Sequence, residues 1–356
     1  MATPDVAAIK KTLETLKDPE TGRSVVTMEQ VHDIVAADGK ISVKLGLTTH
    51  SAPLWNETTQ EAETILKTAY PDQEIAVERT IHNRPPEKIG EIGLTAKSVI
   101  AVGSGKGGVG KSTIAASLAF GLSRAGAAVG LVDADVYGPS IPHLLGVGGR
   151  PEVQDNKISP IEKDGLRVMS MGFLVPPNEA VVWRGPMLHG AITQFIRDTK
   201  WGELDYLIID MPPGTGDIAL TLSQLLPLSG AVVVCTPQDV ALIDAVKAIA
   251  MFKKVEIPVL GMVENMSGFV CPDCNKQYDI FGSGGAKSKA TDLDVPFLGD
   301  LPINMQVRIN GDEGKIESIF DDEIVRPRVE QLTTNLAKNL ANRVKDNPPL
   351  PTLSVL

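Results

Sequence analysis

One glycine-rich stretch constrains the fold of this 356-residue chain more than any other part of it. Residues 99–102 are an apolar run typical of a buried strand, and residues 105–112 then fit the pattern G-x-x-x-x-G-K-S/T. Residues 114–120 continue as an amphipathic helix. A strand, a glycine loop, a Lys-Ser pair and a helix in this order predict a phosphate-binding loop rather than a merely flexible turn.

The chemistry of nucleotide phosphates explains why these residue types occur together. Glycines allow the backbone to curl until successive N–H groups point into one hollow, and the following helix adds the positive end of its dipole. Lys111 can reach the β- and γ-phosphates, and the Ser112 hydroxyl can ligate Mg²⁺. We therefore expect the loop to bind ATP through Gly105, Lys106, Gly107, Gly108, Val109, Gly110, Lys111, Ser112 and Thr113.

Acidic residues follow two of the later predicted strands. Asp210 closes the apolar strand over residues 206–209, which is the Walker B position of a carboxylate that holds Mg²⁺ directly or through water. Asp133 and Asp135 leave the strand that begins at residue 129. Two carboxylates at such a strand end can serve Mg²⁺ and the attacking water, although simple solvation of the strand end is the alternative.

The loop also carries a second lysine, Lys106, within Lys-Gly-Gly-Val-Gly-Lys-Ser. A flexible surface lysine is the simpler interpretation, but the stretch resembles the deviant Walker A motif of the SIMIBI ATPases. That group includes MinD/ParA, the arsenite-pump ATPases and the Mrp/ApbC iron–sulfur carriers. The resemblance implies that Lys106 reaches the partner's nucleotide across a dimer and that Asp135 positions or activates the attacking water. The catalytic residues would then be Lys106, Lys111, Asp135 and Asp210.

A later asparagine, Asn265, follows the apolar strand over residues 259–263. By resemblance to the same ATPases its amide would contact the adenine base. A local Asx turn is the alternative for an asparagine in this position.

Two of the three cysteines, Cys271 and Cys274, stand at C-x-x-C spacing in a predicted loop. They can chelate one soft metal centre, but zinc or a [4Fe–4S] cluster requires four ligands, and no further Cys or His follows nearby. Cys235 lies within an apolar strand and is typical of a core residue. Two ligands per chain therefore favour a site shared by two chains, with a thioredoxin-type redox pair as the alternative.

Taken together, these motifs resemble the Mrp/ApbC family of iron–sulfur cluster carriers over residues 95–320. The family implies a homodimer that binds ATP and Mg²⁺, holds a [4Fe–4S] cluster on Cys271 and Cys274, and passes it to apo iron–sulfur proteins. ATP hydrolysis would be slow and coupled to loading or transfer, with scaffold proteins as further partners. A MinD/ParA-like positioning switch and an arsenite-type transport ATPase are the alternatives. The positioning switch has no use for the two cysteines.

The first 84 residues predict a small α+β domain. Its expected helices cover residues 6–16, 28–36 and 57–69, and its expected strands cover residues 40–47 and 74–81. The unit resembles the MIP18-like (DUF59) domain often found ahead of Mrp-type ATPases. It departs from that pattern at Ala52, where many relatives carry a cysteine, so we assign it no metal ligand. His50 is expected on the surface of a loop.

The rest of the chain predicts an α/β fold of the P-loop NTPase class. Residues 85–97 are expected as a linker, residues 98–346 as the ATPase domain, and residues 347–356 as a loose Pro-rich tail. Near-continuous apolar strands alternate with helices, which implies a mostly parallel sheet covered on both faces. The predicted strands cover residues 129–133, 167–171, 206–210, 230–235 and 259–263, and the main helices cover residues 185–200, 239–254 and 322–345.

Composition excludes several classes of protein. A net charge of −10 argues against a nucleic-acid binder, and no apolar run approaches the length of a membrane span. The last helix carries an apolar stripe but lacks aromatic residues opposite a basic face, so we expect it to pack on the core rather than on a membrane. Three cysteines cannot form a disulfide framework and, with no signal segment recognised, favour the reducing cytoplasm.

Overall fold

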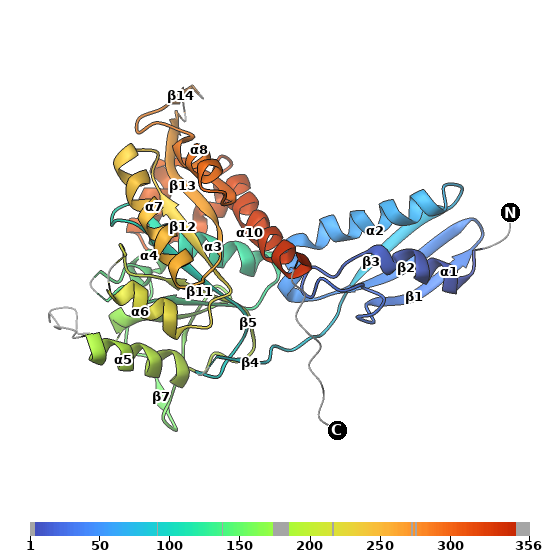
Figure 1. Ribbon diagram of the computed structural model, residues 1–356, viewed down its shortest axis with the longest axis horizontal. Helices are drawn as coiled ribbons and strands as arrows, with labels where there is room; N and C mark the ends of the chain where they lie inside the picture. The colour runs from blue at the N-terminus through green and yellow to red at the C-terminus, as the bar shows by residue number, and fades with distance from the viewer. Residues whose placement is uncertain are drawn as a thin grey trace. The chain divides into compact units, whose positions relative to one another are not determined.

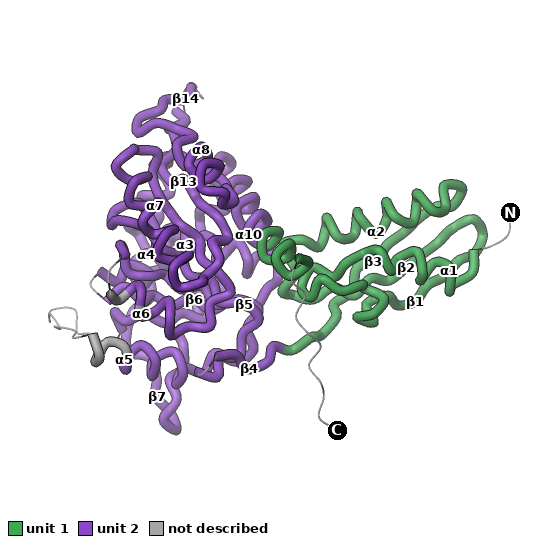
Figure 2. Tube along the Cα trace, viewed as in Figure 1, with its two compact units in different colours: residues 1–85, 337–356 green, residues 86–336 purple. Residues whose placement is uncertain are grey.

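The computed structural model describes residues 4–90, 92–136, 138–173, 185–215, 217–271, 273–274 and 276–346. The chain forms two compact units, shown in green and purple in Figure 2. Unit 1 comprises Met1–Pro85 with Ala337–Leu356, and unit 2 comprises Pro86–Leu336. The Pro-rich tail expected over residues 347–356 lies outside the described residues.

Unit 1 is a three-stranded sheet packed against helices. Strand β2 pairs antiparallel with β1 and parallel with β3. Its core joins Ile9 and Leu13 to Ile41 and Leu45 of β2 and Leu66 of α2. Along the chain the elements are α1 (Val6–Thr12), η1 (Leu13–Thr15), β1 (Val31–Ala37), β2 (Lys40–Leu47), η2 (Thr49–Leu54), α2 (Trp55–Ala69) and β3 (Glu74–Ile81).

Two expectations for this unit are wrong. The helix expected over residues 28–36 is instead strand β1, because Asp38 and Gly39, with φ of 49° and 78°, form a tight turn that pairs it with β2. The Asp-Gly dipeptide is a hairpin signal that outweighs the helical spacing of the preceding apolar residues. His50, expected on a loop surface, is buried within η2.

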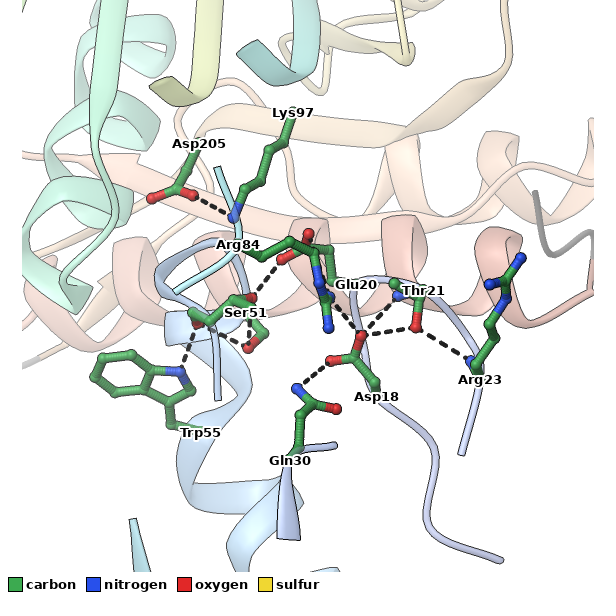
Figure 3. Close-up of polar contacts among 11 residues, drawn as sticks. Asp18, Glu20, Thr21, Arg23, Gln30, Ser51, Trp55, Arg84, Lys97 and Asp205 are labelled. Carbon is green, nitrogen blue, oxygen red and sulfur yellow. Dashed lines mark hydrogen bonds and ion pairs between the residues drawn. The ribbon is translucent and has the colours of Figure 1, made fainter. Parts of the chain in front are cut away.

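A buried carboxylate organises the loops of unit 1 (Figure 3). Asp18 accepts hydrogen bonds from Arg84 Nη1 at 2.8 Å, Thr21 Oγ1 at 2.7 Å and Gln30 Nε2 at 3.1 Å. Burial by itself would raise the pKa of Asp18, but the Arg84 charge and these donors hold it below its ordinary value. This network connects the loop after η1 to Arg84, which lies at the end of the first segment of unit 1.

Unit 2 is built on a ten-stranded sheet (Figure 1). Its hydrogen-bonded order is β14-β13-β12-β5-β11-β6-β10-β9, with β15 paired to β13 and β4 paired to β5. The parallel strands are β5 (Leu94–Ser104), β6 (Val129–Asp133), β10 (Leu166–Ser170), β11 (Leu204–Asp210), β12 (Gly230–Cys235), β13 (Val259–Val270) and β15 (Phe297–Ile303). Antiparallel strands β4 (Lys88–Ile89), β9 (Ile161–Lys163) and β14 (Gln277–Tyr278) complete it, and β7 (Val153–Gln154) pairs separately with β8 (Lys157–Ile158).

Helices cover both faces of this sheet, as the alternating strand–helix pattern predicts. One face packs on α5 to α8, and the alternate strand residues, including Ile100, Val102 and Ile208, are equally buried where α3 contacts β5, β6 and β11. The helices are α3 (Lys111–Ala125), α4 (Ile141–Leu145), α5 (Gly185–Asp198), α6 (Asp217–Leu225), α7 (Asp239–Lys254), α8 (Gly285–Asp292), α9 (Met305–Asp312) and α10 (Arg326–Asp346), with short η3 (Met171–Phe173) and η4 (Ile316–Asp321).

The expected mostly parallel α/β architecture is confirmed. Residues 85–97, expected as a linker, include β4 and the first residues of β5. Strand β13 runs seven residues beyond the expected end at residue 263. Asn265 therefore lies within this strand, which ends directly before Cys271. The apolar stripe of α10 is buried at Val329, Leu332 and Leu336, which confirms that it packs on the protein. In the part of the chain that the structure describes, no helix is long and apolar enough to cross a membrane.

Candidate functional site

The carboxyl ends of three neighbouring parallel strands bring the predicted nucleotide residues together. Asp210 at the end of β11 lies in register with Val102 of β5 on one side and Asp133 of β6 on the other. Ser104, the last residue of β5, leads directly into the glycine loop. This edge of the sheet is where ligands bind in open α/β folds.

The loop depends on glycine at two positions in particular. Gly110 has φ of +80°, and a Cβ there would lie 2.1 Å from the side-chain nitrogen of Asn265. A Cβ on Gly105 would lie 2.1 Å from the backbone carbonyl group of Asp244 in α7. Neither position can accept a side chain without moving its neighbours, so the glycines fix how closely the loop approaches β13 and α7.

Lys111, Ser112 and Asp210 form a compact polar group at the start of α3. The Lys111 ammonium lies 2.5 Å from Asp210 Oδ1, and the Ser112 hydroxyl donates to Asp210 Oδ2 at 2.6 Å. Asp210 is fully buried, and this burial raises its pKa against the opposing effect of the Lys111 charge. The hydroxyl and the carboxylate are hard oxygen donors, the ligands that Mg²⁺ prefers, so they fit the predicted metal.

Asp133 is held differently from Asp210. Its Oδ1 accepts from the backbone N–H of Asp135 at 3.1 Å, and its Oδ2 accepts from Ile141 N–H and Ser170 Oγ, both at 3.1 Å. Burial and the nearby Asp210 charge raise the pKa of Asp133 to about 7. These three contacts fasten the loop after β6 to the sheet. Ser170 was not anticipated from the sequence, because nothing local marks it as a partner of that loop.

Beside these groups lies a cavity of about 330 Å³. Its wall contains most of the predicted nucleotide residues, namely Lys106, Gly107, Gly108, Gly110, Lys111, Ser112, Thr113 and Asp135. Five predicted residues are not part of that wall, namely Gly105, Val109, Asp133, Asp210 and Asn265. The structure adds Ser104, Gly138, Ser140, Leu144 and Pro213 to this wall. Ser104 precedes the glycine loop, Gly138 and Ser140 follow Asp135, and Pro213 follows Asp210.

Lys106 and Asp135, two of the predicted catalytic residues, both line this cavity. Lys106 is half-buried, and its ammonium forms no ion pair within the described ranges. Its carbonyl accepts a hydrogen bond from Ser104 Oγ at 2.9 Å, so its backbone is fixed while its side chain is available. Asp135 accepts from the N–H of Gly138 at 3.2 Å and thereby shapes its own loop.

Asn265 contacts the loop rather than standing apart from it. Its side-chain nitrogen donates to the carbonyl oxygen of Val109 at 2.9 Å, and the residue is buried. The adenine contact expected for this residue stays a prediction.

The two C-x-x-C cysteines lie at the tip of a hairpin. Strand β13 pairs antiparallel with β14, and Cys271 N–H donates to the Lys276 carbonyl at 3.0 Å where the turn begins. Hydrogen bonds from the backbone N–H groups of Cys274 and Asp273 lower the pKa of the Cys271 thiol. Cys271 is half-exposed and Cys274 exposed, whereas burial raises the pKa of Cys235 to about 12. The hairpin thus presents two accessible thiols, one of them disposed to ionise.

In the described part of the chain, no third metal ligand joins the two cysteines. Among the described residues there is no group of three or more His, Cys, Asp or Glu side chains that could hold a metal ion.

Comparison with known proteins matches both units. Residues 95–341 match the family model described as NUBPL iron-transfer P-loop NTPase, and residues 6–78 match that of an iron-sulfur cluster assembly protein. An iron-sulfur cluster carrier protein of Synechocystis is 42% identical over 95% of this chain and 97% of its own length. One from Escherichia coli K12 is 42% identical over 95% and 91%. The iron-sulfur cluster transfer protein NUBPL of Dictyostelium discoideum is 51% identical over 62% and 69%.

Solved structures show the same fold. A nucleotide-binding protein from Archaeoglobus fulgidus in complex with ADP is 42% identical, with a TM-score of 0.57, over 62% of this chain and 88% of that one. The cell division ATPase MinD of Pyrococcus furiosus is 23% identical, with a TM-score of 0.51, over 68% and 98%. At that identity the second likeness concerns the fold alone.

Proposed function

Because the chain belongs to the family of NUBPL-type iron-transfer P-loop NTPases that includes the iron-sulfur cluster carrier proteins, we propose that it carries a [4Fe–4S] cluster between two protomers. It would load this cluster and pass it to apo iron–sulfur proteins, receiving it from scaffold proteins. Slow ATP hydrolysis would be coupled to this cycle. We place the activity in the cytoplasm on account of its free thiols.

The observation that carries the proposal is the hairpin with two accessible thiols in the unit that holds the phosphate loop. The thiolate is the form that ligates iron, and the lowered pKa of Cys271 favours it. A [4Fe–4S] cluster takes four cysteine ligands. Two protomers, each supplying Cys271 and Cys274, would provide that number.

Apolar surface beside the hairpin supports a second copy of this chain as the partner. Ile280 and Phe281 follow β14 and are exposed, as are Val240 and Ile243 of α7. The loop that carries the first pair lies close to the segment before α7, since a Cβ on Gly282 would lie 3.5 Å from the Cβ of Pro237. Exposed apolar side chains gathered next to an incomplete metal site are what a two-fold contact would cover.

The nucleotide site would supply the energy of the cycle. Phosphate oxygens would compete with Asp210 for the Lys111 ammonium, while Ser112 and Asp210 would hold Mg²⁺, which neutralises phosphate charge. Asp135 would orient the attacking water. Lys106 would reach the nucleotide of the partner, for which its unpaired ammonium is available.

The cysteines provide the test. Cys271→Ser and Cys274→Ser should each lose bound iron after anaerobic reconstitution, because oxygen replaces a thiolate ligand, and ATP binding should survive. Iron and sulfide per protomer would be assayed together with the visible spectrum, using Cys235→Ser as the matched control that keeps its cluster. Full iron content in either hairpin variant would overturn the proposal, and zinc alone in freshly isolated wild-type protein would replace it with a structural Cys₄ clasp.

A further inference from the structure

The segment that connects the phosphate loop with the cysteine hairpin is a single stretch of β13. Asn265 lies on this strand and Cys271 directly follows its last residue, Val270, so the two are six residues apart, a span of at most about 20 Å in extended backbone. One end of the stretch touches the nucleotide loop and the other begins the turn with the thiols. A displacement of Asn265 can therefore reach Cys271 through only six residues of backbone.

The contact at the first end is specific. Asn265 donates its side-chain N–H to the Val109 carbonyl at 2.9 Å, inside the loop whose backbone would surround the phosphates. Gly110 has no Cβ to keep that amide away, since an added one would lie 2.1 Å from it. A shift of the Val109 peptide would thus alter this hydrogen bond directly.

The residue before Asn265 anchors the opposite face of the strand. Glu264 is fully buried and accepts hydrogen bonds from Gly284 N–H at 2.7 Å, Ala286 N–H at 2.6 Å and Ser267 Oγ at 2.6 Å. Successive strand side chains point to opposite faces, so Glu264 holds α8 while Asn265 holds the loop. With one face anchored, displacement at Asn265 is directed along the strand rather than sideways.

Beyond this point the strand is irregular. Met266 and Gly268 have φ of +59° and +68°, and the pairing of β13 with β15 shifts between Asn265 and Phe269. The backbone then rejoins regular pairing with β14 and reaches Cys271. A bulged segment between two anchored ones can adjust its dihedral angles without breaking the sheet.

We propose that Asn265 is a positioning residue through which a change in the backbone of the phosphate loop moves the Cys271–Cys274 hairpin. Through the Val109 hydrogen bond, occupation of the loop by nucleotide phosphates changes the geometry and accessibility of the two thiols. This inference rests on the proposed carrier function and assigns the residue through which ATP regulates the cluster site.

Thiol alkylation measures the coupling without iron. The protein free of cluster is treated with iodoacetamide, with and without saturating Mg²⁺ and a non-hydrolysable ATP analogue, and the modified peptides are quantified by mass spectrometry. We expect nucleotide to change the rate at the hairpin thiols by about five-fold, the lower range of allosteric couplings. Cys235, buried and with its pKa raised to about 12, serves as the internal thiol that does not react.

Asn265→Ala should abolish this nucleotide-dependent ratio, and so should Asn265→Asp, which keeps the shape but removes the donor to Val109. Each variant is measured at nucleotide concentrations that saturate it in its own titration, and at protein concentrations where light scattering gives one mass throughout. Asn335→Ala is the matched control, because Asn335 also donates its amide to a strand carbonyl, that of Leu298 at 2.7 Å, and should keep the wild-type ratio.

A wild-type ratio in both Asn265 variants would overturn the inference, as would a wild-type protein whose thiols ignore nucleotide. Either result leaves the carrier proposal standing if Cys271→Ser has lost its iron. Conversely, loss of the ratio in the Asn265 variants together with full iron in Cys271→Ser would reject the carrier proposal while the coupling holds.

Discussion

The phosphate loop and the cysteine hairpin, both in unit 2, are built in opposite ways. At the loop the chemical groups are buried and already paired, as when Asp210 accepts from both Lys111 and Ser112. At the hairpin Cys274 is exposed, Cys271 is half-exposed, and neighbouring Ile280 is 58% exposed. The groups of the first region are paired within one chain, whereas we propose that the second region supplies only two of the four ligands of a shared site.

This difference separates what one protomer does from what two must do. Preorganised donors bind phosphate without further ordering, so we expect a single chain to bind nucleotide. Two thiolates cannot satisfy a four-ligand cluster, so metal binding would be a property of the dimer. Metal would then stabilise the dimer by mass action, because it binds only the assembled form well.

The largest effect is expected at the loop. Lys111→Ala should lower ATP turnover by about 10²–10³-fold or more, since the phosphates lose their main cationic partner in a buried site. Phosphate release measured over time checks this value. Iron content after chemical reconstitution without nucleotide should be unchanged, because the substitution leaves Cys271 and Cys274 in place.

Two further variants separate a loss of catalysis from a loss of folding. Removing Lys111 leaves the buried Asp210 without its partner and can destabilise the fold, so Asp210→Asn is measured as a second lesion of the same site. Lys289→Ala, which alters an exposed lysine of α8 that forms an ion pair with Asp292, is the control with normal turnover. Normal turnover in both site variants would remove the loop from the mechanism.

A smaller effect should appear when two inactive chains are mixed. If Lys106 acts across the dimer, a Lys106→Ala chain paired with a Lys111→Ala chain retains one intact site. Random pairing of equal amounts should then restore about a quarter of wild-type ATPase activity. Activity equal to the sum of the two separate variants at every mixing ratio would show that Lys106 acts within its own chain.

The parallel sheet could be predicted because its strands are near-continuous apolar runs, and the loop because its residues are contiguous. The helix expected over residues 28–36 is wrong, because pairing with β2 through the Asp38-Gly39 turn makes residues 31–37 strand β1. Tertiary pairing overrides such short local patterns.

The candidate site shows the same limit. Lys111 and Asp210 could be identified from motifs, but the Asn265–Val109 hydrogen bond joins residues 156 positions apart and leaves no local trace. Two of the three donors around Asp133 are likewise set by the return of the chain at Ile141 and Ser170. Contacts between residues far apart in the sequence can be identified only from the three-dimensional structure.

The most direct measurement for the shared cluster is native mass spectrometry of the wild-type protein after anaerobic reconstitution, with iron and sulfide assayed on the same sample. The account predicts one [4Fe–4S] mass on the dimer, about two iron atoms per protomer, and no cluster on the monomer. A monomer that carries a complete [4Fe–4S] cluster, or a dimer that carries two, would contradict it.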